Sequence, residues 1–116
     1  MTTYLALIYN TDQAWHDDVP AAPSEEYNEF ARAAAAVLRG GNALHSTATA
    51  TTVRVSGGKG GDILTTDGPY AETKEVLTGY YLLECADLEE AVKTAAMIPA
   101  AWNGGAIEVR PVVHFG

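Results

Sequence analysis

The segment TTDGPYAETKE, residues 65–75, concentrates side chains that can exchange protons or bind ions. It holds a phenol at Tyr70, a carboxylate at Glu72 and an ammonium at Lys74. Asp67 precedes them in Asp-Gly-Pro, which is typical of a turn whose aspartate accepts hydrogen bonds from amides further along the chain. Because loops at the end of a sheet often serve ligands, two interpretations stay open, a turn on a solvated surface and a ligand site.

A histidine oriented by a carboxylate is a common device for proton transfer at neutral pH, so His45 and Asp67 are candidates for a catalytic pair. A hairpin closed over residues 56–61 would pair position 52 with about position 65, which leaves His45 nearer Glu72 than Asp67. The pair therefore requires the segment after Asp67 to fold back. The alternative is a partly exposed histidine at the start of a strand.

Four residues are candidates for contact with a ligand in a cleft near this segment: Tyr70, Glu72, Lys74 and Arg54. If the site were catalytic, Asp67 would be the general base and Tyr70 or Lys74 the electrophilic partner. If it were not, Glu72 and Lys74 would belong to a solvated surface, where an ion pair contributes little free energy.

Other types of site have little support in the sequence. The loop SGGKGGD lacks the Gly-Lys-Ser/Thr ending of a phosphate-binding loop. His16, His45 and His114 lie in separate elements without the spacing of metal ligands, so we expect no metal and no cofactor. The single cysteine, Cys85, lies in the apolar run YYLLECA, which favours a buried structural thiol over a nucleophile.

The chain has 116 residues and a formal net charge of −8. This length fits one domain, residues 1–116, and the negative charge disfavours nucleic acid as a partner. The apolar run at the N-terminus is about seven residues long and has no basic flank, so we expect neither a signal sequence nor a membrane span. With one cysteine and no disulfide framework, a cytoplasmic location is expected.

Two stretches, YLALIY at residues 4–9 and GYYLLECA at 79–86, are apolar on both alternating faces, which predicts strands covered on both sides. Ser24 is a predicted N-cap for a helix whose apolar residues recur up to Leu38. Gly40 and Gly41 are expected to end that helix.

The threonine-rich sequence within residues 43–55 predicts an extended strand, with residues 63–66 as its hairpin partner across the glycine loop. Asp87 and Glu90 have the spacing of a capping box and predict a helix that Pro99 ends. Residues 106–113 predict a last strand, in which Pro111 indicates an edge position or a strand end.

These elements give a βαββαβ plan with one additional strand or hairpin arm, an α+β sandwich of the ferredoxin type. Both helices would cover one face of the sheet, yet the two central strands are apolar on both faces. A second copy of the same sheet would cover the other face, so a homodimer is expected.

The string DGPYAETKE followed by GYYLLE resembles the signature of the DGPF branch of the YCII-related family, normally DGPFAETKE followed by GYYLI. The blocks ALIY, ATATTVR and IEVRP extend the resemblance over nearly the whole chain. Two positions depart from the signature, with Tyr70 in place of phenylalanine and Thr78 in place of glycine. The resemblance implies a ferredoxin-like subunit of the dimeric α/β barrel superfamily.

The resemblance says less about activity. YCII relatives outside this branch carry a histidine in the first helix and an aspartate further on, a proposed catalytic dyad, but SEEYNEFARAAAAVLRGG contains no histidine. Many relatives are encoded beside extracytoplasmic-function sigma factors, which implies a regulatory partner. A ligand-binding or regulatory module, a cofactor-independent enzyme and a purely structural dimer therefore all stay open.

Overall fold

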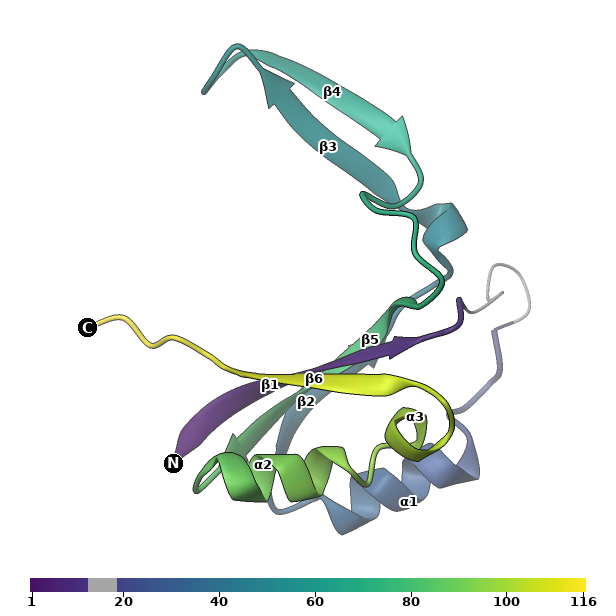
Figure 1. The fold of residues 1–116 in the computed structure, drawn as a ribbon, viewed down its shortest axis with the longest axis vertical. Coiled ribbons are helices and arrows are strands. Elements are labelled where there is room, and N and C mark those ends of the chain that lie inside the picture. Colours follow the sequence, from purple (N-terminus) through teal and green to yellow (C-terminus); the bar gives the residue numbers. More distant parts are fainter. Residues whose placement is uncertain (13–18) are drawn as a thin grey trace.

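The computed structural model describes residues 1–12 and 19–116, so His16 lies outside the described residues. Figure 1 shows a sheet with helices on one face and a hairpin that projects from the end of the sheet, away from the helices. The elements in chain order are β1 (Thr2–Asn10), α1 (Glu25–Ala33), β2 (Leu38–Ala43), the short 3-10 helix η1 (Thr47–Thr49), β3 (Thr51–Ser56), β4 (Asp62–Asp67), β5 (Val76–Cys85), α2 (Leu88–Ala95), α3 (Pro99–Trp102) and β6 (Ala106–Pro111).

The main sheet has the strand order β2-β5-β1-β6, and all its neighbouring strands are antiparallel. Strands β1 and β5 are central, as their two-faced apolar sequences predict. Strand β6 is an edge strand that ends at Pro111, also as predicted. The ferredoxin-like α+β fold is therefore confirmed, with the β3–β4 hairpin inserted between β2 and β5.

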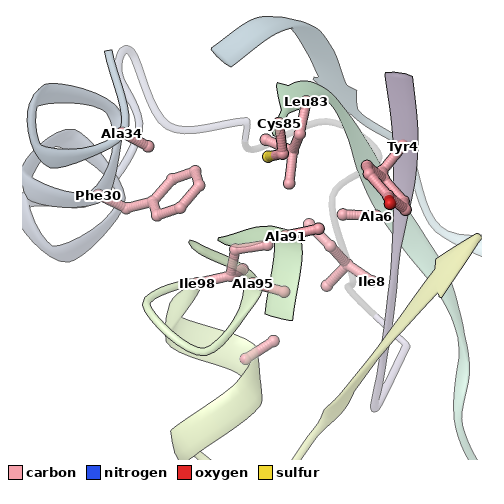
Figure 2. Close-up of a cluster of buried hydrophobic side chains, with 11 residues drawn as sticks. Tyr4, Ala6, Ile8, Phe30, Ala34, Leu83, Cys85, Ala91, Ala95 and Ile98 are labelled. Carbon is pink, nitrogen blue, oxygen red and sulfur yellow. The ribbon is translucent and has the colours of Figure 1, made fainter. Parts of the chain in front are cut away.

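The core lies between the sheet and the helices (Figure 2). Leu83, Cys85 and Ile98 are fully buried, and the ring of Phe30 on α1 packs 4.9 Å from that of Tyr81 on β5. Burial raises the pKa of the Cys85 thiol, and the nearby Glu90 carboxylate raises it further. The expected burial of this thiol is confirmed.

Helix α1 begins where the sequence predicts, because the Ser24 side chain accepts a hydrogen bond from the Tyr27 amide. The predicted end of the helix is wrong. The helix ends at Ala33, and Leu38 begins strand β2, where it pairs with Leu83. Packing on the core thus overrides the helical propensity of the alanine-rich stretch.

Gly40 and Gly41 therefore lie within strand β2 and do not end a helix. A Cβ atom at Gly41 would lie 2.6 Å from the carbonyl oxygen of Tyr80 and 2.5 Å from the Tyr81 ring. The glycine is needed because β2 and β5 approach closely at this point.

Two further boundaries differ from the prediction. Residues 43–55 do not form one strand, because η1 separates β2 from β3. Pro99 does not end the second helix: α2 ends at Ala95, and Pro99 opens the short helix α3. Proline is well suited to the first turn of a helix, because amide groups there have no hydrogen-bond partner within the helix and proline lacks the amide hydrogen.

The N-terminus of α2 follows the prediction closely. Asp87 accepts a hydrogen bond from the Glu90 amide at 2.9 Å, and the Glu90 carboxylate accepts one from the Ala86 amide at 2.9 Å. The first bond satisfies an amide of the first helical turn, and the second ties the residue before the N-cap to the helix.

The face of the main sheet that carries no helix is apolar at its centre. In β1, the side chains of Tyr4, Ala6 and Ile8 point into the core, so the alternating residues Leu5 and Leu7 point to the other face. Their cross-strand partners on β5 are Leu82 and Tyr80. We call this surface, formed by Leu5, Leu7, Tyr80 and Leu82, the open face. Each of its four side chains is only partly buried.

Strands β3 and β4 form a separate two-stranded sheet, here called the arm, residues 51–67. Thr51 pairs with Asp67 and Thr52 with Thr66, one position away from the predicted register. The radius of gyration is 16.4 Å, compared with about 13 Å for a compact domain of this size, because the arm projects from the body (Figure 1). None of the helices in the described ranges is long and apolar enough to cross a membrane.

Candidate functional site

The TTDGPYAETKE segment leaves the arm and returns the chain to the main sheet. Its backbone is fixed where it starts: the Gly68 amide donates to the Ala50 carbonyl at 2.8 Å, and the Thr52 hydroxyl donates to the Gly68 carbonyl at 2.9 Å. Gly68 has φ 103°, a conformation that favours glycine. We call residues 50–52 and 67–70 the arm base. Its turn is held by Ala50, which precedes β3, and by Thr52 of β3.

Arg54, on β3 next to the arm base, meets Tyr70 of the arm base. The Arg54 guanidinium lies over the Tyr70 ring, 5.0 Å from its centroid, in a cation–π arrangement. Tyr70 is nevertheless 77% exposed, so one side of the pair is open to solvent. Two of the four candidate ligand-binding residues are thus brought together.

Asp67, the candidate general base, is exposed at the end of β4. Among the residues that the structure describes, none donates a hydrogen bond to its carboxylate, so it does not cap its own turn. The sequence interpretation in which Asp67 holds the turn is therefore wrong, because the contacts of Ala50 and Thr52 hold it.

Glu72 and Lys74 are exposed on the segment that leads to β5. Neither residue takes part in the ion pairs found in the described part of the chain, which join Arg32 to Glu25, Arg39 to Glu84 and Lys93 to Glu89. Nearby, the Thr73 hydroxyl donates to the Glu75 carbonyl, which bends the backbone locally. Both charged groups are exposed to solvent.

A second polar cluster, absent from the sequence prediction, lies where β1 ends. Asp12 accepts hydrogen bonds from the Thr47 amide at 3.1 Å, from the Thr47 hydroxyl and from the Ser46 hydroxyl at 3.3 Å. Ser46 is 5% exposed and also caps η1 by accepting from the Ala48 amide. His45 precedes Ser46 and is exposed. The sequence shows an aspartate two residues after a central strand, but it does not identify the partners of that aspartate.

The Asp12 cluster explains why counting residues along a hairpin could not place His45. The chain turns through η1 between β2 and β3, so His45 and Asp67 do not lie on one continuous strand. His45 is instead tied to the end of β1 through its neighbour Ser46, which contacts Asp12. Whether His45 and Asp67 act as a pair stays a prediction.

Two cavities lie on the helix side of the molecule. One, of about 500 Å³, runs between α2 and β6 and is lined by apolar residues that include Leu88, Val92 and Val109. The other, of about 300 Å³, lies between α1 and α3 beside Phe30 and Trp102. Neither is lined by a residue of the TTDGPYAETKE segment. No group of three potential metal ligands occurs in the described ranges.

The chemistry available at the arm base follows from its own side chains and from Arg54 beside it. An exposed aromatic ring offers stacking area, and a guanidinium offers paired hydrogen bonds to a carboxylate or phosphate. Lys74 adds a second cation on the same segment. The arrangement can bind a small anion that has a flat or apolar part.

Comparison with known proteins gives a family and a relative. The model of the family described as "YCII-related domain" matches residues 2–116. An "Uncharacterized protein R00369" from Rhizobium meliloti (strain 1021) is 42% identical over 73 residues, which are 62% of this chain and 56% of that protein. The chain therefore matches little more than half the length of this relative.

Proposed function

The chain belongs to the YCII-related domain family, and from this premise we propose that it is a homodimeric protein that binds a small molecule at the arm base. Its resemblance to the DGPF branch rests on the same segment, residues 67–75. The observation that carries the proposal is the Arg54–Tyr70 pair, an exposed ring with a guanidinium 5.0 Å above it.

The chemistry of this pair favours a small anion with a planar part as the ligand. Tyr70 would stack against the planar part while a positive charge contacts the anionic group. The formal charge of the chain is −8, which repels an anion. A cation that is not paired with a carboxylate is therefore needed to attract such a ligand. Within the described residues, neither Arg54 nor Lys74 forms an ion pair with a carboxylate.

The homodimer is supported by the open face. Leu5 lies opposite Leu82, and Leu7 opposite Tyr80, so four large side chains form a continuous apolar patch. Patches of this kind mark interaction sites, and in a symmetric dimer the same surface serves both partners. A second sheet on this face would place the arm base of each copy at the margin of the interface and so could enclose the ligand.

A thermal-shift screen against small carboxylates and phosphates tests the ligand proposal. A ligand at a hundredfold its dissociation constant adds about 2.7 kcal/mol to the free energy of unfolding. A compound that raises the melting temperature of the wild type should lose this effect in Tyr70→Ala. Phe115→Ala is the matched control, because Phe115 is an aromatic residue that is 96% exposed and lies outside the arm base. If Tyr70→Ala responds like the wild type, the ligand binds elsewhere.

An enzyme that uses Asp67 as general base is the alternative, and it has less support. Asp67 is exposed, and neither cavity described above is lined by it. A general base must lie within hydrogen-bonding reach of the proton that it removes, which requires a bound substrate beside Asp67. Turnover of a compound found in the screen, lost in Asp67→Asn with binding retained, would favour the enzyme.

The regulatory part of the proposal is contact with a sigma factor in the cytoplasm. Its support is the resemblance to the DGPF branch and the acidic surface, which suits a basic protein face. Co-purification of a sigma factor with the tagged protein would support this contact. Purification of the protein without a partner, at micromolar concentration, would count against it.

A further inference from the structure

The arm presents an apolar surface that its own chain does not cover. Val53 and Val55 alternate along β3 and therefore point to the same side, and Ile63 lies opposite Val55 on β4. The three side chains are 61%, 51% and 73% exposed. We call the surface formed by Val53, Val55 and Ile63 the arm valine face.

The arm has little support of its own. An isolated two-stranded hairpin is marginally stable in water unless it packs against another element. In the described part of the chain, the arm is tied to the rest of the molecule by the hydrogen bonds of the arm base and by the contact between Arg54 and Tyr70. A projecting strand pair that carries three exposed branched residues therefore fits a packing partner outside its own chain.

The direction of the arm indicates where that partner lies. The helices cover one face of the main sheet, and the arm projects from the end of the sheet on the opposite side (Figure 1). A second copy seated on the open face therefore lies beside the arm. We propose that the arm of each copy packs its valine face against the body of the second copy; this inference rests on the proposed homodimer.

The area of the open face supports a role for the arm. A sheet of four strands whose edge strands β2 and β6 each have 6 residues offers a flat area of roughly 400 Å². Stable interfaces bury about 800 Å² on each partner. Two exchanged arms would add to the area that a sheet of this size buries in a dimer.

The distribution of charge also favours the arm as the part that crosses to the second copy. The arm holds two basic residues, Arg54 and Lys59, and two acidic ones, Asp62 and Asp67, so its net charge is zero. The formal charge of −8 therefore resides in the rest of the chain, and two such bodies repel each other. A neutral arm reaches the second body without adding to this repulsion.

Sedimentation equilibrium on matched variants tests the inference. The triple variant Val53→Thr, Val55→Thr and Ile63→Thr keeps β-branched residues in the strands but removes the apolar surface. Val92→Thr on α2 is the control, since Val92 has the same exposure as Val55, 51%, but lies on the helix side. The triple variant should raise the dissociation constant of the dimer by at least about tenfold, and the control should leave it unchanged.

A second variant keeps the test decisive if the threonines disturb the hairpin. Thr52 and Thr66 are paired, so residues 53–65 can be replaced by Asn-Gly, which suits a two-residue turn between paired positions. This shortened arm should weaken the dimer at least as much as the triple variant while the near-UV circular dichroism of the body persists.

The possible results separate the inference from the proposed function. A wild-type dimer that both arm variants form equally well overturns the inference and leaves the homodimer standing. A wild type that is monomeric at high micromolar concentration overturns both. A photo-crosslinker at position 55, in a mixture of ¹⁵N-labelled and unlabelled protein, should give cross-links between labelled and unlabelled copies; cross-links confined to one copy would also overturn the inference.

Discussion

The Arg54 guanidinium lies 5.0 Å from the centroid of the Tyr70 ring and so joins strand β3 to the segment that follows β4. A cation–π contact at an exposed site contributes about 0.5–1 kcal/mol. Tyr70→Ala should therefore lower the free energy of unfolding by no more than this amount, measured by urea denaturation. Tyr70→Phe should leave the free energy of unfolding unchanged, because it keeps the aromatic ring under Arg54. If Tyr70→Phe destabilised the protein as much as Tyr70→Ala, the cation–π contact would not be the cause.

Asp67→Ala should leave stability nearly unchanged, because no described residue donates a hydrogen bond to the Asp67 carboxylate. Thr52→Val should instead cost about 1 kcal/mol, because it removes the hydrogen bond to the Gly68 carbonyl. Chemical denaturation of the two variants under the same conditions shows which of them loses more stability. A larger loss of stability for Asp67→Ala than for Thr52→Val would mean that the Asp67 side chain does hold the turn.

Gly79→Ala should cost about 1–3 kcal/mol, since a Cβ atom there would lie 2.9 Å from the Asn42 carbonyl oxygen and would push β2 away from β5. Gly40→Ala is the matched control on the same strand pair. Its Cβ atom would make an ordinary 3.8 Å contact with Leu82, so it should be neutral or slightly stabilising. Thermal unfolding of both variants measures the difference, and equal effects would contradict the close approach at Gly79.

The raised pKa of Cys85 predicts a pH dependence of stability. Burial keeps the thiol protonated in the folded state, and the Glu90 carboxylate adds to the effect. The folded pKa lies above the ordinary value of 9.0, so the contribution is complete below that pH and is lost as the pH rises towards the folded pKa. The destabilisation caused by Cys85→Ala should therefore be smaller at pH 10 than at pH 7, in urea titrations at both pH values. A pH-independent difference would contradict this expectation.

Asp87→Ala should lower the free energy of unfolding by about 1 kcal/mol, because it removes the hydrogen bond to the Glu90 amide that caps α2. Glu89→Ala is the control on the same turn. The Glu89 side chain is 75% exposed and pairs with Lys93 on the surface, so its loss should have little effect. Urea denaturation compares the two, and similar losses would mean that the cap contributes little.

Much of the fold could be predicted, because its signals are local or strongly periodic. The apolar alternation of Leu5 and Leu7 with Ala6, and the capping residues Ser24 and Asp87, located central strands and helix starts. The end of α1 could not be predicted in the same way. Alanine-rich residues favour a helix by propensity, and it is pairing with β5, which begins with Leu38 opposite Leu83, that makes the chain turn into β2.

The candidate site was predicted less well, for a physical reason. The segment around Tyr70 was visible in the sequence because its charged and aromatic residues are contiguous. The contact with Arg54 depends on the hairpin register, and the Asp12 cluster joins residues 34 and 35 positions apart. Contacts of this range depend on how β1, η1 and the arm come together, and no local pattern encodes them.

The joint at the arm base has an evolutionary consequence. The hydrogen bonds of Gly68 to Ala50 and Thr52 join the two ends of the arm where it leaves the body. Strands β2 and β5 pair with each other directly, and Ala43 opposite Gly79 is their pair nearest the arm. The register of the main sheet is therefore independent of the length of the arm. Mutations, insertions and deletions beyond the joint leave the core able to fold, so lineages that share this body can diverge in the arm and thereby acquire different partners.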